Sequence, residues 1–142
     1  MKKAILALIF MVGAATIGYS QCDKNYTLIA SKTEFFDGSG TLQRSTEEKS
    51  VIEVKGKEIV ITHGANNETM TGVVKYDTCS WKVPFKEGKA IIKTVFTGDG
   101  GQSMGVTITI EGKDGKITFT GVPDEDQNRR IKLTIDKFEE NK

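Results

Sequence analysis

The sequence is poor in the residues from which catalytic and metal sites are usually built. Its 142 residues include one histidine, His63, one tryptophan, Trp81, and two cysteines, Cys22 and Cys79. A zinc site made of several histidines is therefore excluded, and a Cys₂His site would use both cysteines. No Gly-x-Ser-x-Gly motif, Walker loop or Rossmann glycine pattern occurs. We expect no enzymatic activity, no catalytic residues and no cofactor.

Two local features that could suggest chemistry have simpler interpretations. His63 opens the turn-like stretch 63–67, where we expect an exposed side chain rather than the base of a catalytic triad. The glycine-rich segment 98–101 lies between two expected strands and does not open a helix. It therefore lacks a helix N-terminus to hold a phosphate, and we expect a hairpin loop.

An excess of charge of either sign is also missing. The chain has 20 Lys and Arg against 19 Asp and Glu, and without Lys2 and Lys3 the balance becomes 18 against 19, or −1. Binding to nucleic acid or to an acidic membrane surface is typical of proteins with a strong basic excess. We expect no nucleic-acid partner.

The first twenty residues resemble an export signal. Lys2 and Lys3 precede an apolar run that reaches Ile17, and fourteen of the first twenty residues are hydrophobic. Gly18 and Ser20 supply small residues at positions −3 and −1 for cleavage before Gln21. We expect a signal peptide over 1–20, a single all-β domain over 21–142 without a transmembrane span, and a periplasmic or extracellular location.

The alternative to simple cleavage is lipid attachment at Cys22. Bacterial lipoproteins are cut just before a modified cysteine, usually after an aliphatic residue at −3 and a small one at −1. Tyr19 and Gln21 occupy these positions here. Because exported proteins reside in an oxidising compartment, we mainly expect a disulfide between Cys22 and Cys79. This bond would use the Cys22 thiol and so exclude lipid attachment there.

The mature chain consists of short β-branched or alternating runs separated by turns that contain glycine or aspartate. In the segment Met104 to Glu111, every second residue is apolar, as in a strand with one buried face. The expected strands are Tyr26–Phe36, a ragged one from Thr41, Ser50–Val54, Glu58–Thr62, Thr69–Tyr76, Ser80–Val83, Lys89–Thr97, Met104–Glu111, Lys116–Gly121 and one over 130–136. A charged tail is expected after the last strand.

Short connections between all of these strands favour an antiparallel up-and-down meander over βαβ units. A long meander removes its exposed edges by closing on itself. We therefore predict an all-β fold of eight to ten strands that forms a small barrel, with a two-sheet β-sandwich as the alternative.

The export signal followed by one meander of this length resembles a small bacterial lipocalin-like domain. The resemblance covers the mature chain and rests on strand order. The Gly-x-Trp signature of lipocalins has no counterpart, because Trp81 lies mid-chain after Ser80. The resemblance implies a barrel whose interior holds a small apolar ligand, and it assigns no binding residue.

One partial metal motif is present. Asp124, Asp126 and Asn128 match the first three ligand positions of a calcium loop. The sixth position is Arg129 instead of glycine and the twelfth is Ile135 instead of glutamate. The three residues are thus a weak calcium candidate, and a solvated acidic turn is the expected structure.

Two functions remain open. The first is a non-catalytic exported protein that binds a small apolar ligand inside the barrel, lined by Trp81 or the phenylalanines. The second is a protein-interaction or structural cell-envelope protein whose filled core holds those aromatics. A cavity of a few hundred cubic ångströms would favour the first, and a solid interior the second.

Overall fold

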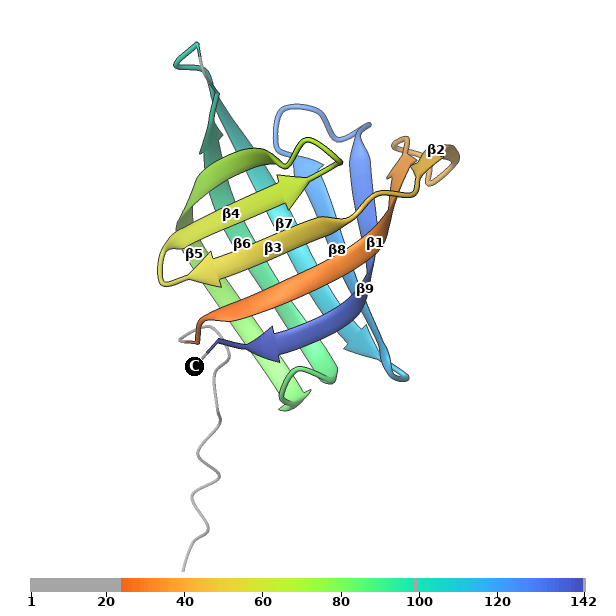
Figure 1. Ribbon diagram of the computed structural model, residues 1–142, viewed down its shortest axis with the longest axis vertical. Coiled ribbons are helices and arrows are strands. Elements are labelled where there is room, and N and C mark those ends of the chain that lie inside the picture. Colours follow the sequence, from red (N-terminus) through yellow and green to blue (C-terminus); the bar gives the residue numbers. More distant parts are fainter. Residues whose placement is uncertain (1–23, 99, 142) are drawn as a thin grey trace, which may run out of the picture.

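The computed structural model describes residues 24–98 and 100–141. These residues form nine strands, which Figure 1 labels along the chain. Their bounds are β1 Tyr26–Phe36, β2 Leu42–Thr46, β3 Ser50–Lys55, β4 Glu58–His63, β5 Glu68–Val83, β6 Glu87–Thr97, β7 Ser103–Lys113, β8 Lys116–Pro123 and β9 Arg130–Glu140.

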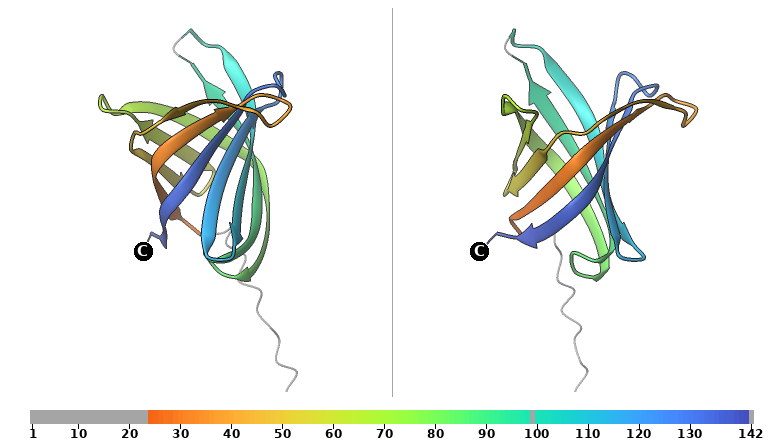
Figure 2. Two further views of the ribbon diagram at one scale, coloured as in Figure 1. Left: turned by 90° about the vertical axis from the view of Figure 1, so that its right-hand side faces the viewer. Right: turned by 45° about the vertical axis from the view of Figure 1, so that its right-hand side comes forward.

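Eight strands form a closed antiparallel barrel. Strands β3 to β9 pair in sequence order, and β1 closes the barrel by pairing with both β3 and β9. The ninth strand, β2, pairs with the far end of β1 and lies outside the barrel wall (Figures 1 and 2). The predicted meander barrel is confirmed, and the sandwich alternative is not the observed fold.

The barrel forms because alternate residues are apolar on most strands. On β7, Val106, Ile108 and Ile110 are buried, whereas Thr107 and Thr109 between them are half-buried on the outer face. Asp114 and Gly115 connect β7 to β8 and both have positive φ, 53° and 78°. A two-residue Asp-Gly turn of this kind matches the twist of its flanking strands, so it fixes the register of the hairpin.

Two predicted boundaries were wrong because β-bulges interrupt the alternation. An extra residue between Val74 and Tyr76 reverses the inward positions, so the two strands predicted over 69–83 are one 16-residue strand, β5. A second bulge lies in β9, where one extra residue separates Ile135 from Lys137 while their partners Ala30 and Ile29 are adjacent on β1. This bulge reverses the inward positions of β9 in the same way. The predicted charged tail is therefore the end of β9, which continues to Glu140.

The two ends of the barrel differ. One end, here called the cavity end, carries the connections 37–41, 64–67 and 124–129, the end of β6 and the start of β7 (upper half of Figure 1). The other end carries the turns 56–57, 84–86 and 114–115 together with Asn25 and Asn141, which are joined by a backbone hydrogen bond of 2.8 Å. Both ends of the described chain therefore lie opposite the cavity end.

A cluster of aromatic rings fills the second end, here called the aromatic end. Phe138 makes edge-to-face contacts with three other rings, with centroid distances of 5.3 Å to Tyr26, 4.7 Å to Phe85 and 5.8 Å to Trp81. Phe85 adopts φ = 58°, a conformation that costs a bulky residue about 1–2 kcal/mol. The ring contacts of Phe85 offset this cost, so the aromatic cluster holds the 84–86 turn in place.

Several sequence-based expectations fall on residues outside the described ranges. The predicted signal peptide 1–20 and Cys22 belong to this group. Cys79 is half-buried on β5 and packs against the core, and its predicted bond to Cys22 stays a prediction. Within the described residues no helix is long and apolar enough to cross a membrane.

Candidate functional site

A cavity of about 290 Å³ opens at the cavity end of the barrel. Its walls come from the inward positions of β1, β3, β4, β5, β6, β7, β8 and β9, close to the connections of that end. Protein interiors are normally close-packed, with few voids larger than a water molecule. A space of this size at the mouth of a barrel is therefore a candidate binding site.

Most of the cavity wall is apolar. Val106, Ile108, Phe119 and Leu133 are at most 8% exposed and form the inner part of the wall. Phe96, 6% exposed, extends the wall on β6. Phenylalanines thus line the cavity as the sequence suggested, whereas Trp81 belongs to the aromatic cluster at the opposite end.

The lip of the cavity exposes apolar side chains to solvent. Met70 is 41% exposed, Met104 40% and Ile131 36%, although all three occupy positions that face into the barrel. They lie on β5, β7 and β9, next to three different connections of the cavity end. An apolar lip around an apolar cavity is the surface that an apolar ligand would cover on entry.

Gly121 gives the cavity part of its width. It occupies an inward position of β8, opposite Ile108 on β7 and Ile131 on β9. A Cβ atom there would meet only Val106 at 3.7 Å and Phe119 at 3.9 Å, which are ordinary van der Waals contacts. A larger side chain at position 121 would therefore reduce the cavity without straining the backbone.

One side of the cavity is polar, and we call it the polar wall. It consists of Thr33 on β1, Glu48 just before β3, Ser50 on β3 and His63 on β4. His63 Nδ1 lies 3.7 Å from Glu48 Oε1, and His63 Nε2 lies 3.9 Å from Glu68 Oε2. The expectation of a freely exposed turn histidine is corrected, because His63 ends β4 with a half-buried side chain that lines the cavity.

The polar wall was not predicted, although a signal for part of it exists. Ser50, Ile52 and Val54 share one face of β3 and are all buried. A serine at the inward position of an otherwise apolar face is the mark of a polar group turned toward the barrel interior. The pairing that brings His63 beside Ser50 could not be seen, because it depends on the register of β3 against β4.

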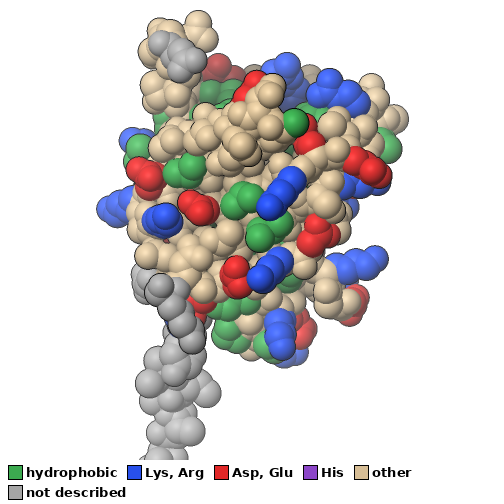
Figure 3. Space-filling model, viewed as in Figure 1, with side chains coloured by type: hydrophobic (Ala, Val, Ile, Leu, Met, Phe, Trp, Pro, Cys, Tyr) green, Lys and Arg blue, Asp and Glu red, His purple; other side chains and the backbone are tan. Residues whose placement is uncertain are grey.

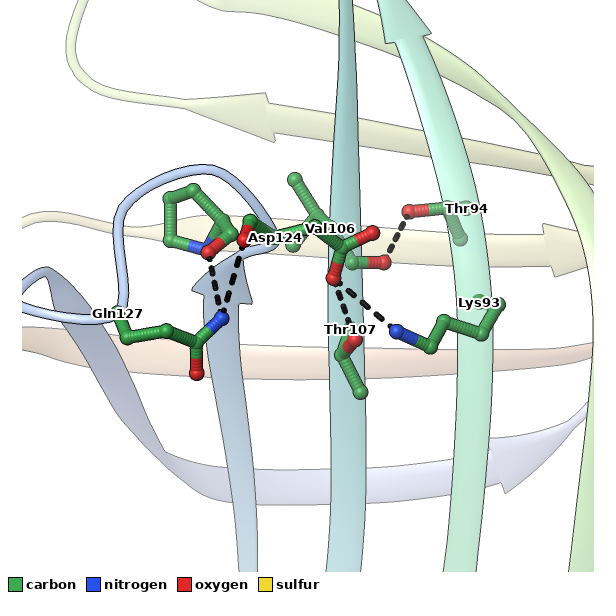
Figure 4. A network of polar contacts seen from close by, with 7 residues as sticks. Lys93, Thr94, Val106, Thr107, Asp124 and Gln127 are labelled. Atoms are coloured by element: carbon green, nitrogen blue, oxygen red, sulfur yellow. Dashed lines mark hydrogen bonds and ion pairs between the residues drawn. The ribbon is translucent and has the colours of Figure 1, made fainter.

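The calcium candidates Asp124, Asp126 and Asn128 are engaged in protein contacts. Asp124 Oδ1 accepts hydrogen bonds from Thr107 Oγ1 at 2.8 Å and Lys93 Nζ at 3.1 Å (Figure 4). Asp126 Oδ1 accepts one from the backbone N–H of Asn128 at 3.1 Å. The described residues include no group of three or more His, Cys, Asp or Glu side chains arranged to hold a metal.

Two exposed carboxyl groups at the cavity end are held in their charged form. The hydrogen bond from Thr107 and the hydrogen bond and charge of Lys93 lower the pKa of Asp124. The Ser39 hydroxyl, followed by the backbone N–H of Thr41, lowers the pKa of Asp37. These bonds attach the 124–129 loop to β6 and β7 and fix the 37–41 turn, so they shape the surroundings of the mouth.

At the aromatic end, the Tyr26 hydroxyl is kept in its protonated form. Burial, assisted by the negative charge of Asp77, raises the pKa of Tyr26 far above its usual range. A shallow hollow of about 490 Å³ lies between Val83–Glu87 and Asp114–Gly115, with Lys86, Glu87 and Asp114 on its walls. Its charged walls make it a poorer site for an apolar molecule than the cavity at the other end.

The surface shows no patch of one charge on the face drawn in Figure 3, where Lys and Arg side chains alternate with Asp and Glu. No protein-family model matches this chain, and comparison with curated proteins gives no significant match.

Proposed function

We propose that the protein is a non-catalytic, exported binding protein that holds a small apolar ligand in the cavity of its barrel. The observation that carries the proposal is the cavity itself, about 290 Å³ in volume and lined mostly by apolar side chains. A volume near 30 Å³ for each water molecule implies space for roughly ten waters, or for a ligand of similar bulk.

The construction of the two ends supports this proposal. The aromatic cluster packs one end, whereas the cavity end keeps Met70 and Met104 at its lip. The lipocalin-like arrangement of the barrel agrees with binding inside it, as a likeness of fold only. The lysine-led apolar segment 1–20 supports export to the periplasm or the extracellular space.

The test compares binding of 2-methylnaphthalene, an apolar probe of suitable size, by the wild type and by Gly121→Leu. We expect the wild type to bind the probe, seen as chemical-shift changes of cavity residues and a raised Tm. The introduced leucine side chain would occupy the cavity, so binding should weaken at least about tenfold, equivalent to about 1.4 kcal/mol.

Thr120→Leu is the matched control, because Thr120 neighbours Gly121 on β8 but does not line the cavity. The control should bind the probe like the wild type. No binding by the wild type, or equal binding by Gly121→Leu, would overturn the proposal. If Gly121→Leu does not fold, Gly121→Ala takes its place with a smaller expected effect.

A second candidate function, docking of a protein partner, is favoured by exposed apolar side chains on β5. Val73 is 52% exposed, Tyr76 59% and Val83 40%. Native mass spectrometry of the protein from its own host distinguishes the two functions. A retained small molecule supports ligand binding, and a retained protein chain supports docking.

A further inference from the structure

We propose that the ligand carries a hydrogen-bond-donating group, a hydroxyl or an amine, which binds at the polar wall beside Ser50 and Glu48. This inference rests on the proposed function and adds the chemical class of the ligand. It follows from three properties of the polar wall: its register, its unpartnered hydroxyl groups and its charge.

The register of three neighbouring strands concentrates the polar groups on one side of the cavity. Ser50 lies opposite Ala30 of β1 and opposite His63 of β4. Side chains of directly paired residues project from the same face of a sheet, so Ser50 and His63 are neighbours inside the barrel. The apolar side chains Val106, Ile108 and Phe119 line the cavity from β7 and β8. A bound molecule would meet a polar side and an apolar side.

The hydroxyl groups of Ser50 and Thr33 have no partner among the described residues, and their oxygen atoms are not fully enclosed, since both side chains line the cavity. Ser50 is 2% exposed and Thr33 6% exposed, and neither side chain has a hydrogen bond with any described residue. A ligand that covered these hydroxyl groups without a hydrogen bond would bury them unfavourably. The cavity is where Ser50 and Thr33 can find a partner.

Two other buried hydroxyl groups have partners within the barrel. Thr94, 2% exposed, donates from Oγ1 to the carbonyl oxygen of Val106 at 3.1 Å (Figure 4). Thr27, 9% exposed, donates to Asn141 Oδ1 at 2.8 Å. Among the four buried serine and threonine side chains of the described residues, the two without a partner are thus the two that line the cavity, which indicates a polar group on the ligand.

The charges around the polar wall select the kind of polar group. Glu48 lines the cavity, and Glu68 lies on the other side of His63 at its rim. No lysine or arginine is among the described residues that line the cavity. Arg44 lies on β2, outside the barrel, and its guanidinium stacks over the Phe35 ring of β1 at 4.2 Å from the ring centroid. A ligand carboxylate would be repelled by Glu48, and the His63 ring that could donate to it already lies between Glu48 and Glu68, whereas a ligand hydroxyl or ammonium group could donate to Glu48.

The test uses four probes with one ring system and different end groups: 2-methylnaphthalene, 2-naphthalenemethanol, 2-naphthylmethylamine and 2-naphthoate. Calorimetry or NMR titration at pH 7 gives the Kd of each for the full mature chain. We expect the alcohol and the amine to bind about fivefold or more tighter than the hydrocarbon. The carboxylate should bind more weakly than the hydrocarbon.

Two substitutions assign the effect to the polar wall. Ser50→Ala should abolish most of the advantage of the alcohol and leave the Kd of 2-methylnaphthalene within about twofold. Glu48→Gln should weaken the amine and strengthen the carboxylate. Ser80→Ala and Glu53→Gln remove the same groups at positions that do not line the cavity, and they should preserve the wild-type order.

The outcomes separate this inference from the proposed function. If 2-methylnaphthalene binds in the cavity but the alcohol and amine bind no better, only the end-group inference is wrong. Tightest binding by 2-naphthoate, or an alcohol advantage that survives Ser50→Ala, would also overturn it. If none of the four probes binds, the proposed function itself fails.

Discussion

Single side chains at the cavity end show how the barrel ties its loops to its wall. Asp124 follows β8 directly, and its carboxylate accepts hydrogen bonds from Thr107 on β7 and Lys93 on β6. Gly105, two residues before Thr107 on β7 and opposite Val95 on β6, leaves room for the Asp124 side chain, because a Cβ there would approach Asp124 Oδ2 to 2.6 Å. The 124–129 loop is thereby fixed at a point three residues from Gly121 in the cavity wall.

Asp124→Asn should lower the free energy of unfolding by up to about 1 kcal/mol at neutral pH, because exposed charged contacts are worth little. The fold lowers the pKa of Asp124, so its contribution is complete above the ordinary value of 3.8. It is lost as the pH falls through the lowered pKa. Urea unfolding between pH 2 and 7 should show the two curves converging only below about pH 4.

Glu125→Gln is the control for this prediction, because it removes one negative charge from the next, exposed residue. Its stability should differ little from that of the wild type over the same pH range. A difference between wild type and Asp124→Asn that stays constant down to pH 2 would contradict the assigned role of the carboxylate.

At the scale of elements, alternation predicted most strands, and the bulges explain where it failed. The segments around β3, β4, β7 and β8 were anticipated because their inward-facing residues keep one parity, and β1 was anticipated although its inward positions change parity between Ala30 and Thr33. Within β5, inward positions change from Val74 to Cys79 and Trp81, so no single period covers the strand. In β9 the bulge turns Phe138 inward after Ile135, and the charged residues around it resemble a tail.

The aromatic cluster gives the elements of the aromatic end a shared point of contact, and Phe138 is its centre. Phe138→Ala should lower the free energy of unfolding by about 2–4 kcal/mol, because it removes three ring contacts and leaves a void. Urea unfolding followed by Trp81 fluorescence measures the loss. The emission of folded Phe138→Ala should also shift, since Trp81 loses a ring neighbour.

Phe36→Ala provides a comparison outside the cluster. Phe36 is half-buried at the end of β1, away from the aromatic end, and its ring contacts no other aromatic ring of the described residues. It should cost less stability than Phe138→Ala and leave the Trp81 emission unchanged. Equal losses for the two variants would show that the cluster has no special role.

At the scale of the whole molecule, the hydrophobic core is modest, and the predicted Cys22–Cys79 disulfide would add to its stability. The seventeen buried hydrophobic residues form one cluster. The sequence predicts closure into a barrel but not which strands close it, because the pairing of β1 with β9 joins segments about a hundred residues apart. The cavity could not be predicted from the sequence either, since it depends on which inward side chains meet across the barrel.

A disulfide between Cys22 and Cys79 would close a loop of 58 residues and stabilise the fold by roughly 4 kcal/mol in the chain-entropy model. We expect the purified exported protein to lack titratable thiols. Cys22→Ser with Cys79→Ser should unfold at markedly lower urea concentration than the oxidised wild type, and like the reduced wild type. Two free thiols in the exported protein, or a lipid on Cys22, would contradict the pairing.

The position of the chain ends has a practical consequence for handling the protein. Asn25 and Asn141 meet at the aromatic end, and the Lys24 side chain pairs with Glu140 there at 3.4 Å. The mouth of the cavity is at the opposite end of the barrel. A support, a fusion partner or a membrane joined through either terminus would therefore face the packed end and leave the mouth directed toward the solution.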